Sequence, residues 1–375
     1  MKTMLTALGL MSGTSMDGID AALIETDGEG VVRMGASVEL AYTEEERALL
    51  RQALADALPM KKRTERPGVV GAAERLITRK HADIISDFLK EHDLSPEDID
   101  VVGFHGQTVL HRPHERLTVQ IGDGQALADS LGIPVVHDLR AADVAEGGQG
   151  APLVPAYHQA LVREAKLAGP VAVLNLGGVG NITYIAEGHD PVAFDTGPAN
   201  ALIDDLMLER SGVAMDQDAR QALAGQVNQE MLVTLMTHPF FGEKPPKSLD
   251  RNAFSRETVA GLSTRDAAAT LAAFTARSAA AARRWLPREP RLWIVSGGGA
   301  RNPAILKFLR EETGATVRTA DEFGWSASMM EAQAFAYLAV RSLKGLPLTF
   351  PSSTGVPRAL TGGVLATPGQ SRLRA

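Results

Sequence analysis

The stretch GLMSGTSMDGIDAAL (residues 9–23) decides the fold. Apolar residues precede and follow it, and Gly9, Gly13 and Gly18 lie among hydroxyl side chains and two carboxylates. This order predicts a strand, a turn of small residues and a second strand. Because glycine has no Cβ, N–H groups in such a turn can point into one concavity. The stretch predicts either a phosphate-binding turn or an ordinary hairpin with a glycine-rich turn.

The polar side chains of this turn suit a phosphate and a metal ion. Thr14 and Ser15 offer hydroxyl donors for phosphate oxygens. Asp17 or Asp20 could hold a magnesium ion, usually through water.

Composition excludes several classes of protein. A chain of 375 residues predicts two domains. A net charge of −7 argues against a nucleic-acid surface, and the absence of cysteine excludes disulfides and thiolate metal sites. No segment reaches the about 20 apolar residues of a membrane span. The N-terminal apolar run leads straight into the glycine-rich turn, so we expect a cytoplasmic protein without a signal peptide.

The chain contains two similar arrangements of short strands. Strands are predicted at 3–9, 19–26 and 31–40, and again at 171–178, 181–188 and 191–197. Helices and strands follow each set, which predicts a duplicated α/β unit with the ligand between the halves. We expect one domain over 1–135, to which part of 345–375 returns, and a second over 136–344 with a helical insertion at 215–290.

Two further glycine turns lie in the second half. NLGGVGNIT (175–183) places Gly177 and Gly178 between two strands, with Asn181 as a donor, and repeats the logic of the first turn. SGGGARN (296–302) places Gly297, Gly298 and Gly299 after a strand, where backbone can approach a flat ligand such as adenine or ribose. Together the three turns predict a nucleotide site.

Two carboxylates have both a catalytic and a structural interpretation. Asp195 is predicted to end a strand and precede a helix, so it could be a general base or the N-cap of that helix. Glu331 closes the sequence Ser-Met-Met-Glu (328–331), which is typical of a capping box that opens the last helix.

Two basic side chains are candidate ligands. Arg140 could clamp a carboxylate or phosphate, or form a salt bridge with Asp138 or Asp143. His105, in GFHGQT (103–108), could bind a substrate hydroxyl or be a hydrogen-bonded histidine at the end of a strand. The chain lacks His-Glu-x-x-His and other zinc spacings, and also the Gly-x-Ser-x-Gly motif of serine hydrolases.

Seven motifs together resemble those of the anhydro-N-acetylmuramic acid kinases. In chain order they are GLMSGTSMDGID, GFHGQT, QIGDGQALA, DLRAADVAEGGQGAPLVPAYH, LNLGGVGNIT, FDTGPAN and SGGGARNP. The resemblance runs from about residue 8 to about residue 365, and MSGTSMDG and GGQGAPLVP are the most specific parts. It implies a two-domain actin-like ATPase and sugar-kinase fold, with duplicated RNase H-like β-meanders and an interdomain cleft.

The resemblance also implies a reaction with two coupled parts. Water opens the 1,6-anhydro bridge of 1,6-anhydro-N-acetylmuramic acid, and the 6-oxygen takes the γ-phosphoryl group of ATP. The product is N-acetylmuramic acid 6-phosphate, in the recycling of peptidoglycan. The resemblance assigns the ATP phosphates, with magnesium, to the turn made of Gly13, Thr14, Ser15, Met16, Asp17, Gly18, Ile19 and Asp20.

The remaining roles fall on three residues. The resemblance makes Asp195 the general base that activates water, and Glu331 a ligand of the sugar. The lactyl carboxylate of that sugar requires a cation, for which Arg140 is our hypothesis. We expect the sugar to be selected at Arg140, Asp195 and Glu331, on the side of the cleft opposite the phosphate turn.

One motif departs from the family pattern. Where the family has Tyr or Phe followed by Asp-Lys-Asp-Gly, this chain has Met-Asp-Gln-Asp-Ala at 215–219. A kinase for another anhydrosugar, such as levoglucosan, therefore stays as an alternative, as does a non-catalytic actin-like nucleotide switch. The resemblance also implies a homodimer, whose interface the sequence does not locate.

Overall fold

Each predicted set of three strands forms an antiparallel meander in the computed structural model, which describes residues 2–249 and 253–369. The first meander consists of β1 (Leu5–Ser12), β2 (Gly18–Thr26) and β3 (Val32–Ala41). The second consists of β7 (Val171–Leu176), β8 (Val179–Ile185) and β9 (Val192–Pro198). Short polar turns rich in glycine join the strands, as expected for hairpins.

Parallel strands extend both meanders in the same way. In the first sheet the order is β12-β6-β4-β1-β2-β3, with β5 paired to β4. In the second the order is β11-β10-β7-β8-β9. The strands β4 and β10 run parallel to the first strand of their meanders, and β6 and β11 run parallel to β4 and β10. The predicted duplicated α/β fold is therefore confirmed.

The added strands of the first sheet include the motif GFHGQT. It lies inside β4 (Val101–Arg112), so His105 is within a strand and not, as predicted, at the end of one. The other added strands are β5 (Leu117–Ile121), β6 (Val135–His137) and β12 (Val364–Ala366). The helices of this part of the chain are α1 (Glu44–Ala57), α2 (Val70–Glu91), α3 (Gly124–Leu131), α4 (Ala141–Ala145), α5 (Pro155–Glu164), α11 (Met330–Leu343) and α12 (Pro351–Thr354).

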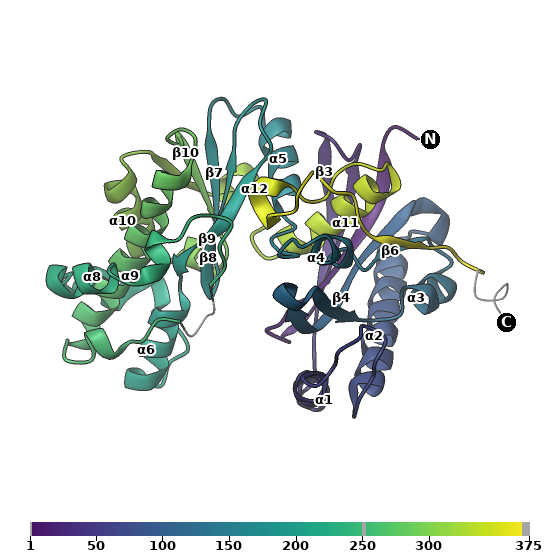
Figure 1. Cartoon of the computed structure of the whole chain (residues 1–375), viewed down its shortest axis with the longest axis horizontal. Helices are drawn as coiled ribbons and strands as arrows, with labels where there is room; N and C mark the ends of the chain where they lie inside the picture. Colours follow the sequence, from purple (N-terminus) through teal and green to yellow (C-terminus); the bar gives the residue numbers. More distant parts are fainter. Residues whose placement is uncertain (1, 250–252, 370–375) are drawn as a thin grey trace. The chain divides into compact units, whose positions relative to one another are not determined.

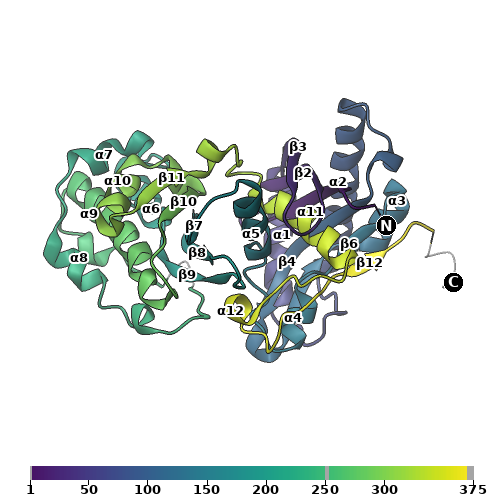
Figure 2. The same ribbon diagram turned by 90° about the horizontal axis from the view of Figure 1, so that it is seen from above.

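Glycines allow the helix α11 to lie directly on the first sheet (Figures 1 and 2). Gly9 of β1 and Gly103 of β4 are register partners. A Cβ at Gly9 would lie 1.8 Å from the carbonyl oxygen of Ala332, and one at Gly103 would lie 2.1 Å from that of Phe335. Both distances are far below van der Waals contact, so only glycine permits this approach of helix to sheet.

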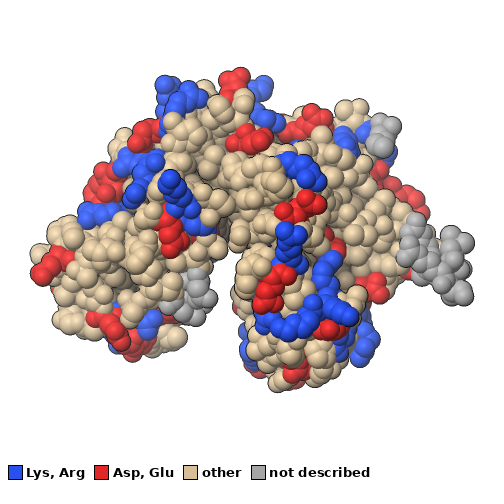
Figure 3. Space-filling model, in the orientation of Figure 1, with Lys and Arg blue, Asp and Glu red and all other residues tan. Residues whose placement is uncertain are grey.

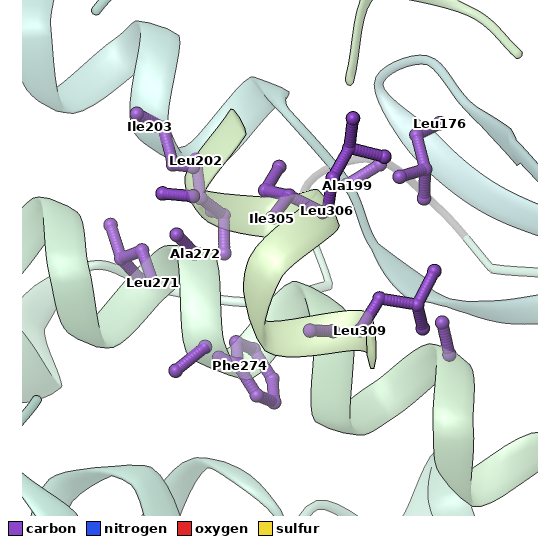
Figure 4. Packing of buried hydrophobic residues seen from close by; sticks show 14 of the residues in the cluster. Leu176, Ala199, Leu202, Ile203, Leu271, Ala272, Phe274, Ile305, Leu306 and Leu309 are labelled. Carbon is purple, nitrogen blue, oxygen red and sulfur yellow. The ribbon is translucent and has the colours of Figure 1, made fainter. Parts of the chain in front are cut away.

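The second sheet has strands β10 (Leu292–Ser296) and β11 (Thr316–Thr319) beside its meander. Its helices are α6 (Ala201–Ser211), α7 (Arg220–Ala224), α8 (Gln229–Leu235), α9 (Thr264–Ala281) and α10 (Pro303–Thr313). The alanine-rich face of α9 packs closely against its neighbours because small side chains allow helices to approach. Figure 4 shows the apolar side chains of this core, contributed by α6, α9, α10 and the end of β7.

The chain divides into two compact units at other positions than expected. The first unit consists of 1–164 and 329–375, and the second of 165–328. The predicted boundaries at 135/136 and 344 therefore need correction. Because β6 pairs with β4 and α11 packs on β1, segments that precede and follow the second unit in the chain both belong to the first. Residues 370–375 of the returning segment lie outside the described residues.

The charged side chains are distributed over the surface. On the face drawn in Figure 3, Lys and Arg are interspersed with Asp and Glu. Within 2–249 and 253–369, no helix combines the length and the hydropathy that a membrane span requires.

Candidate functional site

A network of buried polar side chains supports the glycine-rich turn of the first unit. Ser12 Oγ donates to Gln107 Oε1 at 2.6 Å, and the hydroxyls of Ser12 and Tyr42 lie 2.8 Å apart. Gln107 Nε2 donates to the carbonyl oxygen of Gly13 at 3.1 Å, which also accepts from Met16 N. These bonds fix the path of the backbone from the end of β1 into the turn. Sequence reasoning named Ser12 only as a hydroxyl of the turn and missed Gln107 and Tyr42, because the three residues are far apart in the chain.

The tip of the turn is open to solvent. Thr14, Ser15 and Asp17 are exposed. In the described part of the chain neither hydroxyl has a hydrogen-bond partner. Met16 has a φ of 56°, so the turn is left-handed at its centre. Exposed donors on a fixed turn are what a phosphate ligand requires.

Asp20 lies near the start of β2, where the neighbouring charged side chains are negative. Burial, together with the nearby charges of Glu39, Glu331 and Asp17, raises the pKa of its carboxyl to about 6. No cation among the described residues forms an ion pair with Asp20. A carboxylate surrounded by like charges favours binding of a cation.

A magnesium ion could be held here through Asp17 and Asp20. The described residues contain no group of three or more His, Asp or Glu side chains close enough to chelate an ion. Magnesium, however, needs only one or two carboxylates when water and substrate phosphates complete its coordination. The two carboxylates fit that arrangement.

Glu331 occupies the first turn of α11, but it does not close a capping box. The N-cap is Met329, which makes no side-chain capping bond, so the predicted Ser328–Glu331 capping box is wrong. The Glu331 side chain is exposed at the surface, but the surrounding protein removes part of the water around its carboxyl. This partial desolvation raises the pKa of the carboxyl, and the charge of Arg140 opposes the rise. Glu331 is thus available for a role other than capping.

Arg140 lies at the start of α4, and its guanidinium is held by two neutral acceptors. Nε donates to His105 Nε2 at 3.0 Å, and Nη1 donates to the carbonyl oxygen of Gly150 at 2.7 Å. Within the described residues no carboxylate lies within 4.0 Å of Arg140, so the alternative of a salt bridge to Asp138 or Asp143 is not realised. Burial lowers the pKa of Arg140 to about 10, so it stays charged at neutral pH.

His105 faces Arg140 and is not open to a substrate hydroxyl. Its side chain is buried, and Nδ1 lies 2.7 Å from the carbonyl oxygen of Gly106. Because both ring nitrogens have partners in the protein, we replace the predicted substrate contact with a role in holding Arg140.

Most of the candidate site belongs to one unit. The turn at 13–17, Asp20, Arg140 and Glu331 all lie in the first unit, and the charge of Glu331 acts on both Asp20 and Arg140. The expectation that Arg140 and Glu331 lie opposite the phosphate turn, in another domain, is therefore wrong. They belong to the first unit because α4 follows β6 and α11 packs on the first sheet.

Asp195 lies in the second unit, inside a strand. The strand β9 continues to Pro198, and α6 has Asn200 as its N-cap, so the interpretation of Asp195 as a helix cap is wrong. Asp195 Oδ2 accepts from the backbone N of Leu249 at 2.8 Å, and its own N donates to Lys247 O. Burial raises the pKa of the carboxyl and outweighs the opposing effects of this hydrogen bond and the Lys247 charge, so the pKa is about 6.

The glycine turns of the second unit have packing roles as well as open surface. The carbonyl oxygens of Gly177 and Gly178 accept from the N–H groups of Asn200 and Ala199, which ties this turn to the start of α6. Gly297 has a φ of 75°, and a Cβ there would lie 2.4 Å from Asn175 Oδ1. Gly298, in contrast, is exposed with open space around it. Asn181 pairs with Asp195 across β8 and β9.

The departure from the family pattern at 215–219 leaves a well-formed turn. Asp216 accepts from the N–H groups of Gln221 and Ala222 and so caps the start of α7. Ala219 has a φ of 52°, the left-handed region that glycine adopts most easily. This is the position at which the family pattern has glycine, and here alanine adopts the left-handed conformation.

Comparisons with known proteins agree with the motifs. The sequence matches the family described as anhydro-N-acetylmuramic acid kinase over residues 5–368. The protein of that name from Azorhizobium caulinodans is 58% identical over 367 residues, which cover 96% of this chain and 99% of that protein. The one from Methylobacterium nodulans is 56% identical over 372 residues, which cover 96% of this chain and 100% of that protein. A solved xylulose kinase from Lactobacillus acidophilus aligns with a TM-score of 0.49 at 10% identity, covering 98% of this chain and 95% of that one.

The match extends over both units and includes every motif quoted above. By this match and by an identity above one half to full-length relatives, the chain belongs to the anhydro-N-acetylmuramic acid kinase family.

Proposed function

We propose that this chain uses ATP and water to convert 1,6-anhydro-N-acetylmuramic acid to N-acetylmuramic acid 6-phosphate and ADP, a step of cell-wall recycling. The observation that carries the proposal is the family match over residues 5–368. Because ATP and recycled amino sugars are metabolised in the cytoplasm, we assign the reaction to that compartment.

The turn of the first unit is the proposed site of the ATP phosphates. Its exposed Thr14 and Ser15 hydroxyls and its fixed backbone support this role. Phosphoryl transfer depends mainly on positioning and on neutralising charge. Magnesium held through Asp17 and Asp20 would supply that neutralisation. We propose that Gly177, Gly178, Asn181 and the glycines at 297–299 contact the remainder of the nucleotide.

Asp195 is the proposed general base. With a pKa of about 6 it is deprotonated at neutral pH and still basic enough to accept a proton from water. The water oxygen bonds to the anomeric carbon as the bond from that carbon to the bridging 6-oxygen breaks. The 6-oxygen then bonds to the γ-phosphorus as the bond to ADP breaks, and one water proton passes to Asp195.

Arg140 and Glu331 are the proposed ligands of the sugar. Arg140 remains charged and keeps one nitrogen without a partner among the described residues, which suits the lactyl carboxylate. Glu331 would accept from sugar hydroxyl or amide groups.

A single incubation tests the proposal. The protein, ATP and magnesium are mixed with a panel of anhydrosugars in ¹⁸O-water, and products are identified by mass spectrometry. We expect the muramic acid substrate to give a 6-phosphate with label at the anomeric hydroxyl. Preferred conversion of levoglucosan would instead identify another anhydrosugar kinase. ATP binding without any sugar phosphate would favour a nucleotide switch.

A further inference from the structure

The Arg140 guanidinium is restrained along one edge. Its Nε and Nη1 atoms donate to His105 and Gly150, whereas Nη2 has no partner within the described residues. The guanidinium has five N–H donors in a rigid plane, so two bonds fix the direction in which the remaining donors point.

His105 can act only as an acceptor toward Arg140. The carbonyl oxygen of Gly106 cannot donate, so the proton of the ring is on Nδ1 and Nε2 carries a lone pair. Burial and the charge of Arg140 hold the pKa of His105 well below its ordinary value, which keeps the ring neutral. Neutral His105 therefore orients the guanidinium without neutralising it.

Gly150 is fixed in turn by a buried carboxylate. Its N–H donates to Asp143 Oδ1 at 2.6 Å, and Thr354 Oγ1 donates to Asp143 Oδ2 at 2.6 Å. The carbonyl oxygen of Thr354 accepts from Gln149 N at 2.7 Å. Asp143 is 2% exposed and Thr354 is fully buried. The C-terminal helix α12 thus anchors the loop whose carbonyl oxygen holds Arg140.

We propose that His105, Asp143 and Thr354 are positioning residues that hold Arg140 with its Nη2 edge free for the carboxylate of the substrate. The inference rests on the function proposed above and deepens it, since it assigns selection for an anionic sugar to this network. A guanidinium that is already oriented loses little side-chain freedom on binding, so affinity for the carboxylate depends on the network.

Calorimetric titration of the full chain with two sugars tests the role of Thr354. The ligands are 1,6-anhydro-N-acetylmuramic acid and 1,6-anhydro-N-acetylglucosamine, which lacks the lactyl carboxylate. Thr354→Val removes the hydroxyl donor and should weaken binding of the acid about tenfold, with an effect of no more than about twofold on the neutral sugar. Thr354→Ser keeps the donor and should restore selectivity.

Two further comparisons separate positioning from a loss of structure. Thr26 is a buried threonine of the same unit whose hydroxyl donates to Val31 O and accepts from Gly28 N, so Thr26→Val is a control that should leave selectivity unchanged. His105→Gln keeps an acceptor for Arg140, whereas His105→Leu removes it. Selectivity for the acid should be higher in the glutamine variant.

The outcomes that overturn the inference are distinct from failure of the proposed function. Equal weakening of both sugars in Thr354→Val, no weakening of either, or equal affinity of the wild type for the two sugars would overturn it. If the variants change binding of the two sugars as expected, but the protein forms no sugar phosphate from ATP, the proposed function is rejected and the positioning role is supported.

Discussion

The carboxyl group of Asp195 combines a raised pKa with one fixed oxygen. Leu249 N donates to Oδ2, while burial in the second unit raises the pKa to about 6. A carboxylate in such a setting is a stronger base than an exposed aspartate. These properties support the role of general base that the family resemblance implies.

Asp195→Asn should retain the fold and lose at least about 10³-fold in kcat, since asparagine keeps the shape but cannot accept the proton. Steady-state assays with circular dichroism as the control for folding test this prediction. Turnover close to that of the wild type would exclude Asp195 as the base.

The rate should fall at acidic pH with an apparent pKa of about 6, because a base acts only when deprotonated and Asp195 gains its proton below that value. The profile of kcat/KM against pH at saturating magnesium measures this. Asp20 has a similar pKa, so Asp20→Asn is the control. If the acidic limb disappears in that variant, Asp20 rather than Asp195 is its source.

At the scale of elements, α11 connects the first sheet to the candidate site. Its residues Ala332 and Phe335 lie against glycines of β1 and β4, and Glu331 is in its first turn. Helical periodicity predicts such a helix from the sequence. The sequence Ser-x-x-Glu satisfies the capping pattern at Ser328, but the N-cap is Met329, one residue later, so this local pattern alone misplaces the start of the helix.

Gly103→Ala should destabilise the protein by about 1–3 kcal/mol or more, because the new methyl group would meet the α11 backbone at 2.1 Å. Denaturant unfolding measures the change. Gly71→Ala in α2 is the matched control, since its nearest contact would be 3.7 Å, and a helical alanine should be neutral or stabilise by up to about 1 kcal/mol. Equal stability of both variants would contradict the packing argument.

At the scale of the whole molecule, the two units differ in how the chain builds them. The second unit is one continuous segment, 165–328, and its apolar core consists of its own residues. The first unit needs two segments, 1–164 and 329–375, because α11 covers the strands of its sheet.

An isolated 165–328 fragment should therefore fold with a cooperative thermal transition, whereas 1–164 should do so only when a 329–375 peptide is added. Thermal unfolding followed by circular dichroism measures both. The 165–328 fragment with the peptide is the control for unspecific effects of the peptide. A cooperative transition of 1–164 alone would show that α11 is dispensable for the first unit.

The sequence by itself determined the two meanders, the positions of the glycine turns and the family, because alternation, glycine spacing and motifs are local properties of the chain. Only the tertiary structure placed Arg140 and Glu331 in the same unit as the phosphate turn, and showed His105 to be an acceptor for Arg140. Thr354 and Asp143 are 211 residues apart in the chain, yet they share a hydrogen bond of 2.6 Å. Such pairs depend on packing of distant segments, which no local pattern records. The role of the turn at 9–23 at the phosphates stays a prediction, whereas the buried bonds of Gln107 and Tyr42 show how its backbone is held.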